Sequence, residues 1–279
     1  MTRRNLLVGS LGTALTAASV KMALDGIGNL PDMASKSRRT IPESGRGNDS
    51  ARDVKHDISL TRSDPYPFTT AYIQELRDIP AGSFSYGFHN GQSEAAPVVD
   101  VSAFRMGATP VTWAMWKEYC RAESVTLPEG IQRIDSYPVN GISYNDIVGS
   151  NGGGGFCGWA SRVTGTTLQL PTGIQFEYAA RGGKDRLDYP WGNEFDSSLV
   201  SDGVGLAAVD RSDHVYRNAY GLSDMVGNVY QWCSNDYSSG KEIRGGGGAE
   251  PEEYRCAERI SDLPQNKLVL YGFRLVAPA

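Results

Sequence analysis

The sequence predicts an α+β domain in which a few helices come first and irregular β structure follows. Two segments carry the helical signal: apolar residues recur at helical spacing in "TPVTWAMWKEYCRAE", and a capping box opens "LPTGIQFEYAARGG". After the second segment, turns such as "GLSDMVGN" alternate with short aromatic strands. The 33 glycines and 14 tyrosines also favour a loop-rich body over long helices.

The elements can be assigned in chain order from about Thr70 onwards. "YIQELRDIPAGSFSYG" predicts two strands joined by a Pro-Ala-Gly turn, and the alternation in "VVDVSAFRMG" predicts a further strand. Thr112 is the predicted N-cap of the first helix. A second helix is expected after Ser143, with a glycine-rich interruption before it resumes in "FCGWASRV". Thr172 and Gln175 form the capping box of the third, which a Gly-Gly pair should end.

The bulk composition is that of one sizeable globular domain. Hydrophobic residues make up 40% of the 279 residues and charged residues 21%. The formal net charge of -5 argues against a nucleic-acid partner. The three histidines are widely separated, and the sequence contains neither HExxH nor CxxC, so a histidine-rich zinc or iron centre is not expected.

Residues 1–24 have the pattern of an export signal. Arg3 and Arg4 precede an apolar stretch, Leu6–Val20, that is short, interrupted by glycine and has small residues around Ala17 to Ser19. The arginine pair is typical of a twin-arginine signal, so we expect an exported protein that keeps no membrane span after cleavage. The alternative is an amphipathic N-terminal helix of a cytosolic protein. A lipoprotein anchor at this end is not expected, because the first cysteine is Cys120.

Residues 25–69 predict a flexible polar linker. The stretch "MASKSRRTIPESGRGNDSARDVKHD" mixes charges with serine, glycine and proline and has few large apolar residues. Such a segment buries too little surface to offset the entropy lost on ordering. The folded domain is therefore expected to span residues 70–279.

Six motifs in this domain resemble one known family. "LPTGIQFEYAARGG", "YPWGNEF", "NAYGLSDMVGNVYQWCSN", "IRGGGG", "YRCAER" and "GFRLV" occur in the order and spacing of the formylglycine-generating enzymes, or sulfatase-modifying factors. Relatives in that family include a pyoverdine-maturation protein and the variable proteins of diversity-generating retroelements. The resemblance covers about Ile73 to Val276 and implies a C-type-lectin-like fold with few helices, twisted antiparallel sheets and much irregular structure. A fold alone does not imply a function.

The resemblance also implies a copper site that this sequence lacks. In the formylglycine-generating enzymes, two cysteines after the "RGG" strand bind copper and oxidise a substrate cysteine. Thiolates suit Cu(I), and carboxylates are poor substitutes. This chain has "GGAEPEE" there, and its next cysteine, Cys256, matches a structural cysteine of the family. Gly247, Tyr230 and Leu270 also replace the usual serine, tryptophan and asparagine of the active site, so copper-dependent formylglycine generation is not expected.

The disulfides that the resemblance implies are broken as well. Cys157 and Cys256 match family cysteines whose partners correspond here to Leu275 and Ala180. Four cysteines can re-pair in three ways or remain buried thiols. They are Cys120, Cys157, Cys233 and Cys256. We expect at most one new disulfide.

A structural calcium ion is a further implication of the resemblance, in the turn around "GNVYQW". Its ligands here would be the Asp224 side chain, the Gly227 and Val229 carbonyls, and the Gln231 side chain. The family usually has Asn at the first position and Glu at the last, so one carboxylate is kept but moved across the site. Calcium takes six to eight oxygen ligands in a flexible geometry and tolerates such an exchange. The alternative is a turn held by Asp224 hydrogen bonds alone.

The segment from "RGG" to "GFR" is the predicted binding face. In the variable-protein branch of the family this segment is an exposed surface whose side chains vary to bind different partners. The predicted ligand-binding residues are Tyr230, Glu250, Glu252, Glu253, Tyr254, Glu258, Asp262, Gln265, Asn266 and Lys267. The glycines before them would let a backbone or a ligand approach closely. The alternative is a solvated loop with no special function.

Three functions remain open at this point. The first is an exported, non-catalytic protein that binds a protein or a small molecule. The second is an exported oxidative tailoring or maturation factor that resembles the pyoverdine-maturation relative. The third, a true formylglycine-generating enzyme, is disfavoured by the missing cysteine pair. The sequence identifies neither the ligand nor a catalytic residue.

Overall fold

A computed structural model describes residues 64–91, 95–150, 154–201, 206–209, 216–247 and 250–279. The signal-like residues 1–24 and most of the predicted linker 25–69 lie outside the described residues. Within these ranges no helix is both long enough and apolar enough to cross a membrane.

The described part begins with a helix, α2 (Pro67–Gln74), and not with the predicted strand. Glu118, on helix α3 (Trp113–Glu123), accepts hydrogen bonds from the backbone amides of Phe68 and Thr69, at 3.0 Å each. It also accepts one from the Thr69 hydroxyl, at 2.6 Å. A carboxylate from a remote helix therefore satisfies the first amides of α2, which the local sequence could not reveal.

Helix α2 corrects one boundary, the predicted end of the linker. Residues 67–69 were predicted to be linker, but they form the first turn of the helix, and Thr69 is completely buried. Tyr66, just before the helix, packs edge-on against Trp159 with ring centres 5.3 Å apart. The folded domain therefore includes residues that were predicted to be flexible linker.

Two small antiparallel sheets follow. In the first, β1 (Arg77–Ile79), β4 (Phe104–Met106) and β9 (Val276–Pro278) pair in the order β1-β4-β9. In the second, β2 (Gly82–Ser85) pairs with β3 (Val98–Val101). The stretch "VVDVSAFRMG", predicted to be one strand, is thus two strands in different sheets.

The predicted helices are confirmed with one change. α6 (Gly173–Ala180) opens with the expected capping box: Thr172 Oγ1 accepts from the Gln175 amide at 3.1 Å, and Gln175 Oε1 accepts from the Thr172 amide at 2.9 Å. The interrupted helix is two helices, α4 (Tyr144–Val148) and α5 (Gly155–Thr164). Thr112 stands at the N-cap of α3, but its side chain makes no capping hydrogen bond.

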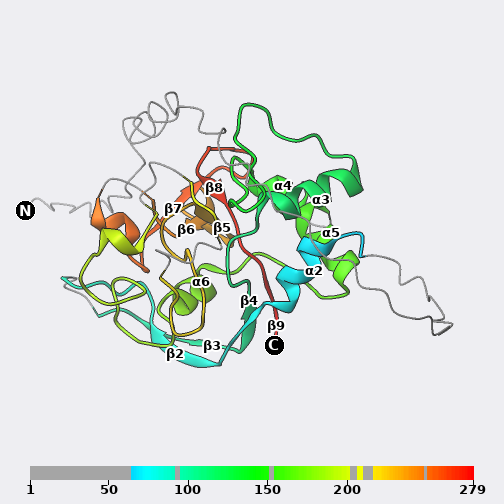
Figure 1. Cartoon of the computed structure of the whole chain (residues 1–279). Helices are drawn as coiled ribbons and strands as arrows, with labels where there is room; N and C mark the ends of the chain where they lie inside the picture. Colours follow the sequence, from blue (N-terminus) through cyan, green and yellow to red (C-terminus); the bar gives the residue numbers. More distant parts are fainter. Residues whose placement is uncertain (1–63, 92–94, 151–153, 202–205, 210–215, 248–249) are drawn as a thin grey trace, which may run out of the picture.

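The central sheet carries the predicted binding face. Its strands are β5 (Tyr230–Tyr237), β6 (Gly240–Arg244), β7 (Arg259–Asp262) and β8 (Tyr271–Gly272). They lie in the order β7-β6-β5-β8, antiparallel except for the β5–β8 pair. Figure 1 shows this sheet in the middle of the molecule, with α6 near it and with α2 to α5 gathered on one side. Two 3₁₀ turns, η1 (Ser197–Leu199) and η2 (Pro251–Tyr254), complete the irregular second half.

An aromatic core joins the helices to this sheet. Trp116 on α3 stacks on Phe156 of α5, with ring centres 5.4 Å apart and planes 9° apart. Phe273, just after β8, meets both rings edge-on. Burying such large rings supplies much of the favourable free energy of folding. The α+β prediction, with helices early and irregular β structure late, is confirmed.

Candidate recognition site

The segment between β6 and β8 leaves the sheet through a glycine turn. Gly245 and Gly246 have φ angles of 96° and 54°, a backbone conformation that other residues rarely adopt. A Cβ at Gly246 would overlap the carbonyl of Glu253 in η2. These glycines therefore let the chain after β6 lie close against the backbone of η2. The sequence predicted such a close approach.

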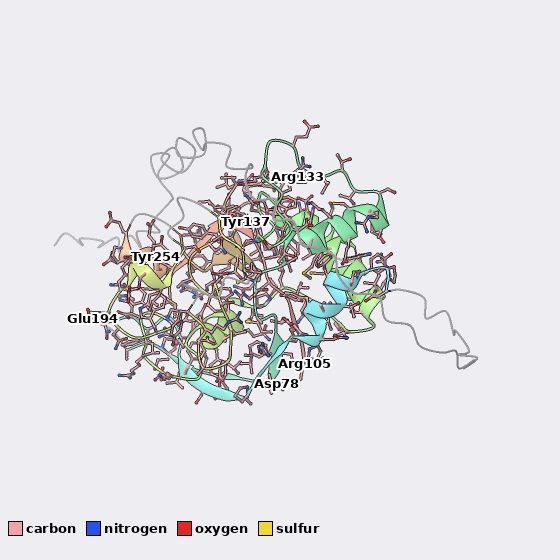
Figure 2. The ribbon with its side chains drawn as sticks, viewed as in Figure 1. Asp78, Arg105, Arg133, Tyr137, Glu194 and Tyr254 are labelled. Carbon is pink, nitrogen blue, oxygen red and sulfur yellow. The ribbon has the colours of Figure 1, made fainter. Side chains whose placement is uncertain are left out.

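The 3₁₀ turn η2 presents the acidic residues. The amide of Glu250 donates to Glu253 Oε2 at 3.0 Å, so Glu253 caps the turn, while Glu252 pairs with Arg255 at 3.5 Å. Glu250 and Glu252 are exposed. Beneath them Tyr254 packs on Phe195 with ring centres 5.3 Å apart. Figure 2 shows Tyr254 and Glu194 at the end of the molecule away from α2 and α5.

The ten predicted ligand-binding residues fall into three groups. Four are exposed: Glu250, Glu252, Gln265 and Lys267. Four are partly exposed: Glu253, Glu258, Asp262 and Asn266. Two are buried, because Tyr230 and Tyr254 are each only 3% exposed. Those two tyrosines support the face from below and cannot offer their rings to a ligand, which corrects the prediction for them.

Several polar side chains of the face are held in place by one another. Asp262 accepts a hydrogen bond from Asn266 Nδ2 at 2.6 Å, and Lys267 pairs with Asp146 of α4 at 2.8 Å. Tyr271, which the sequence interpretation missed, lies under the face and forms a hydrogen bond with Asp262. Burial raises the pKa of Tyr271, and Asp262 raises it further, so the phenol keeps its hydrogen. The face is therefore partly ordered before any ligand arrives.

A buried charge cluster fixes the base of the segment. Arg244, at the end of β6, donates to Glu177 Oε2 at 3.0 Å and to Glu242 Oε1. Glu177 also accepts from Arg181 Nη2 at 2.6 Å. Arg244 Nη1 donates to the Cys256 carbonyl at 3.2 Å, which ties the chain between η2 and β7 to β6. The sequence signal for this cluster is the arginine that precedes the glycines in "IRGGGG".

The cysteines form no disulfide in this structure, and all four are buried. This agrees with the prediction of at most one new disulfide. Burial raises the pKa of the Cys256 thiol to about 12, although Arg181 and Arg244 lower it. Cys120 has its thiol pKa raised to about 11, chiefly by burial. None of these thiols is an accessible thiolate near neutral pH, the form that binds metals and acts as a nucleophile.

The turn that the resemblance assigns to calcium is tightly closed. Asp224, Gly227 and Asn228 all have positive φ, at 49°, 82° and 63°. Asp224 Oδ2 accepts from Asn228 Nδ2 at 3.2 Å, and the Gly227 carbonyl accepts from the Val229 amide at 2.8 Å. The described residues contain no group of three or more His, Cys, Asp or Glu side chains that could hold a metal.

Gln231 does not fit as a calcium ligand in this arrangement. Its Oε1 accepts from Arg274 Nε at 2.6 Å, and its Nε2 donates to the Asp224 carbonyl at 2.8 Å. Arg274 is fully buried and also donates to the Ser223 and Asp224 carbonyls, at 2.8 Å each. A guanidinium cation therefore already holds the oxygen that Gln231 would offer. The remaining ligands would be the Asp224 carboxylate and the two backbone carbonyls.

Calcium thus stays a prediction, which a melting experiment can decide. An ion that binds only the native state raises stability by mass action. The prediction expects chelator to lower the melting temperature of the wild-type protein and not that of Asp224→Ala, which has no side-chain oxygen to offer. Identical wild-type melting curves with chelator and with added calcium would contradict it and leave Arg274 as the cation of this turn.

The α+β architecture, the central sheet and the long, mostly irregular chain in the second half of the domain define a C-type-lectin-like fold. The sulfatase-modifying factor enzyme 1-like domain matches residues 62–279, and the chain therefore belongs to this family, that of the formylglycine-generating enzymes. The family and fold that the six motifs implied are confirmed.

Sequence relatives include both active and inactive members. The inactive C-alpha-formylglycine-generating enzyme 2 of Mus musculus is 29% identical over 194 residues, which cover 61% of this chain and 57% of the relative. The formylglycine-generating enzyme of Thermomonospora curvata is 30% identical over 192 residues, covering 61% of this chain and 54% of the relative. The chain thus matches little more than half the length of these two relatives.

Two solved structures share the fold. PvdO from Pseudomonas aeruginosa has a TM-score of 0.60 at 23% identity, covering 73% of this chain and 94% of PvdO. Treponema denticola variable protein 1 has a TM-score of 0.57 at 19% identity, covering 73% of this chain and 95% of that protein.

Proposed function

We propose that this protein is a non-catalytic recognition protein on a formylglycine-generating-enzyme-like scaffold. Its binding face is the segment 250–267, which we call the recognition segment. The observation that carries the proposal is the construction of this segment: a buried charge cluster and two buried tyrosines hold its backbone, while its acidic, amide and lysine side chains remain exposed. A rigid base with an adaptable polar surface suits the binding of a protein or small-molecule partner.

The chemistry of the cysteines supports the non-catalytic part. The copper-dependent reaction of the family needs accessible thiolates after the "RGG" strand, and this chain has carboxylates there. Cys256, within the segment, is only 2% exposed, and its carbonyl accepts a hydrogen bond from Arg244. The likeness to an inactive member of the family agrees with this choice.

An exported oxidative maturation factor is the second candidate. One observation favours it: half-buried Glu258 lies at the base of the recognition segment, and burial raises its pKa although Arg244 lowers it. Carboxyl groups with raised pKa values are common at catalytic sites. The fold likeness to PvdO is compatible with this role. A peptide-siderophore gene cluster around the gene would favour it over simple recognition.

Photo-cross-linking tests the recognition segment directly. A photo-reactive residue at exposed Gln265 is expected to capture a partner in the protein's own cells, and the same residue at exposed Glu75, beyond α2, is not. The double variant Glu250→Lys/Glu252→Lys should abolish the capture and leave the melting temperature nearly unchanged, because exposed substitutions cost little stability. Glu253 is left intact, since it caps η2.

The control carries the same charge change elsewhere. Glu75→Lys/Glu129→Lys reverses two exposed carboxylates outside the recognition segment and should leave the capture at Gln265 intact. Capture that survives Glu250→Lys/Glu252→Lys would place the partner site elsewhere. Copper-dependent conversion of a cysteine peptide to formylglycine would contradict the non-catalytic proposal.

We also propose export through the twin-arginine route. Arg3 and Arg4 lie outside the described residues, so this rests on the sequence pattern alone. Replacing both by lysine should block delivery out of the cytoplasm, and the exported protein should lack the signal-like segment. Delivery that is unchanged in this variant would reject the route, and uncleaved native protein in the cytosol would reject export.

A further inference from the structure

Two arginines face each other on the edge strand β7 of the central sheet and its neighbour β6. Arg259 on β7 and Arg244 on β6 are direct antiparallel partners. Like charges in such a position repel each other. Arg244 is neutralised by Glu177 and Glu242. Arg259 has no ion pair with any residue in the described parts of the chain, so one positive charge at this edge lacks an anion.

Arg259 is nevertheless held in one orientation. Its guanidinium carbon lies 4.5 Å from the ring centre of Tyr237 and 5.3 Å from that of Tyr86. Its Nη1 donates to Tyr86 Oη at 2.8 Å. All three side chains are partly exposed, and the Nε and Nη2 hydrogens of Arg259 meet no acceptor among the described residues. A fork fixed in this way loses little conformational entropy when it binds.

Tyr86 offers a further donor beside this fork. Its Oη accepts from Arg244 Nη2 and from Arg259 Nη1, both at 2.8 Å. Burial raises the pKa of Tyr86, although Arg244 and Arg259 lower it, so the phenol keeps its hydrogen. With its acceptor positions occupied by two guanidinium groups, the phenol can only donate. Within the described residues that hydrogen has no acceptor.

We propose that Arg259 and Tyr86 form a binding site for a ligand carboxylate. The guanidinium fork of Arg259 would bind its two oxygens, and the Tyr86 hydroxyl would donate to one of them. A planar carboxylate matches a planar fork. The single negative charge of a carboxylate also matches the single unpaired cation, Arg259, whereas a phosphate or sulfate dianion would need a second cation.

The acidic residues of the recognition segment do not fill this site. Successive strand residues point to opposite faces, so Ile260 and Asp262 face away from Arg259. Asp262 is bonded to Asn266 and Tyr271, and Glu258 takes the backbone amide of Arg259, not its guanidinium. Arg259 lies within the recognition segment, but its site uses none of the acidic side chains proposed for recognition and can be tested without the acidic variants.

The test follows the Arg259 Nε–H signal of ¹⁵N-labelled full-length protein by NMR. The protein is titrated with sodium acetate, and with sodium chloride and sodium sulfate at matched ionic strength. We expect a saturable shift with acetate and weaker, non-saturating shifts with the other salts. Tyr86→Phe should weaken acetate binding about tenfold, the effect of losing one charge-assisted hydrogen bond. Arg259→Lys should weaken it by a similar factor, and because this variant has no guanidinium Nε–H it is followed through the backbone amide signal of Ile260, compared with the same signal in the wild type. Arg162→Gln, at an exposed ion pair on α5, should bind acetate like the wild type.

Several results would overturn the site. The absence of a saturable acetate shift would reject it, and sulfate binding as tight as acetate would reject the carboxylate assignment. If Arg259→Lys does not fold, Tyr86→Phe decides, since acetate binding at wild-type strength in that variant removes Tyr86 from the site. Glu250→Lys/Glu252→Lys should keep acetate binding, so a failure of the recognition proposal would leave this one standing.

Discussion

Glu177→Gln is expected to lower the free energy of unfolding by about 3–5 kcal/mol, the cost of leaving buried charges unpaired. Glu177 is completely buried and accepts from Arg181, from Arg244 and from the Gly87 amide. Arg181 has no other carboxylate within the described residues, so the substitution leaves its buried guanidinium with carbonyl partners alone. The measurement is urea unfolding of both proteins at neutral pH.

An exposed ion pair provides the matched control. Glu123 pairs with Arg162 at 2.8 Å, and both side chains are more than a third exposed. Glu123→Gln should therefore change stability by no more than about 1 kcal/mol, as surface pairs do. Equal effects of the two substitutions would mean that the buried cluster contributes no more than a surface contact. Because the cluster anchors η2 and β7, Glu177→Gln should also loosen the recognition segment.

The fold was predictable because its signals are local. The capping box at Thr172 and Gln175, the helical spacing before Glu123 and the aromatic strands each occupy one short stretch. Helix α2 was missed because its first amides are capped by Glu118, which is remote in the sequence. A local pattern cannot show a partner of that kind.

The candidate site was predictable only as a segment. Family motifs placed it between "RGG" and "GFR", and its exposed acids were correctly expected on the surface. Side-chain direction was not predictable: Tyr230 and Tyr254 turn inward, and Gln231 binds Arg274. Arg259 and Tyr86 come from distant stretches and meet only in the folded sheet, so neither suggested a site alone.

Glu118→Gln is expected to detach α2 from the domain. Glu118 accepts from the Phe68 and Thr69 amides and from the Thr69 hydroxyl, and it is only 2% exposed. A neutral amide has one acceptor oxygen for these three donors. Hydrogen bonds to a buried charged group contribute about 1.5–3 kcal/mol each, so we expect stability to fall by at least about 2 kcal/mol.

Hydrogen exchange separates this local effect from a general loss of stability. The Phe68 and Thr69 amides should exchange much faster in Glu118→Gln, while amides of β5 and β6 change only with global stability. Glu75→Gln is the control, because it removes the same charge at the C-terminal end of α2, where a carboxylate opposes the helix dipole. It should leave stability unchanged or slightly raised. Protection of α2 that survives Glu118→Gln would show that packing of Tyr66 and Tyr72, and not the remote cap, holds the helix on the domain.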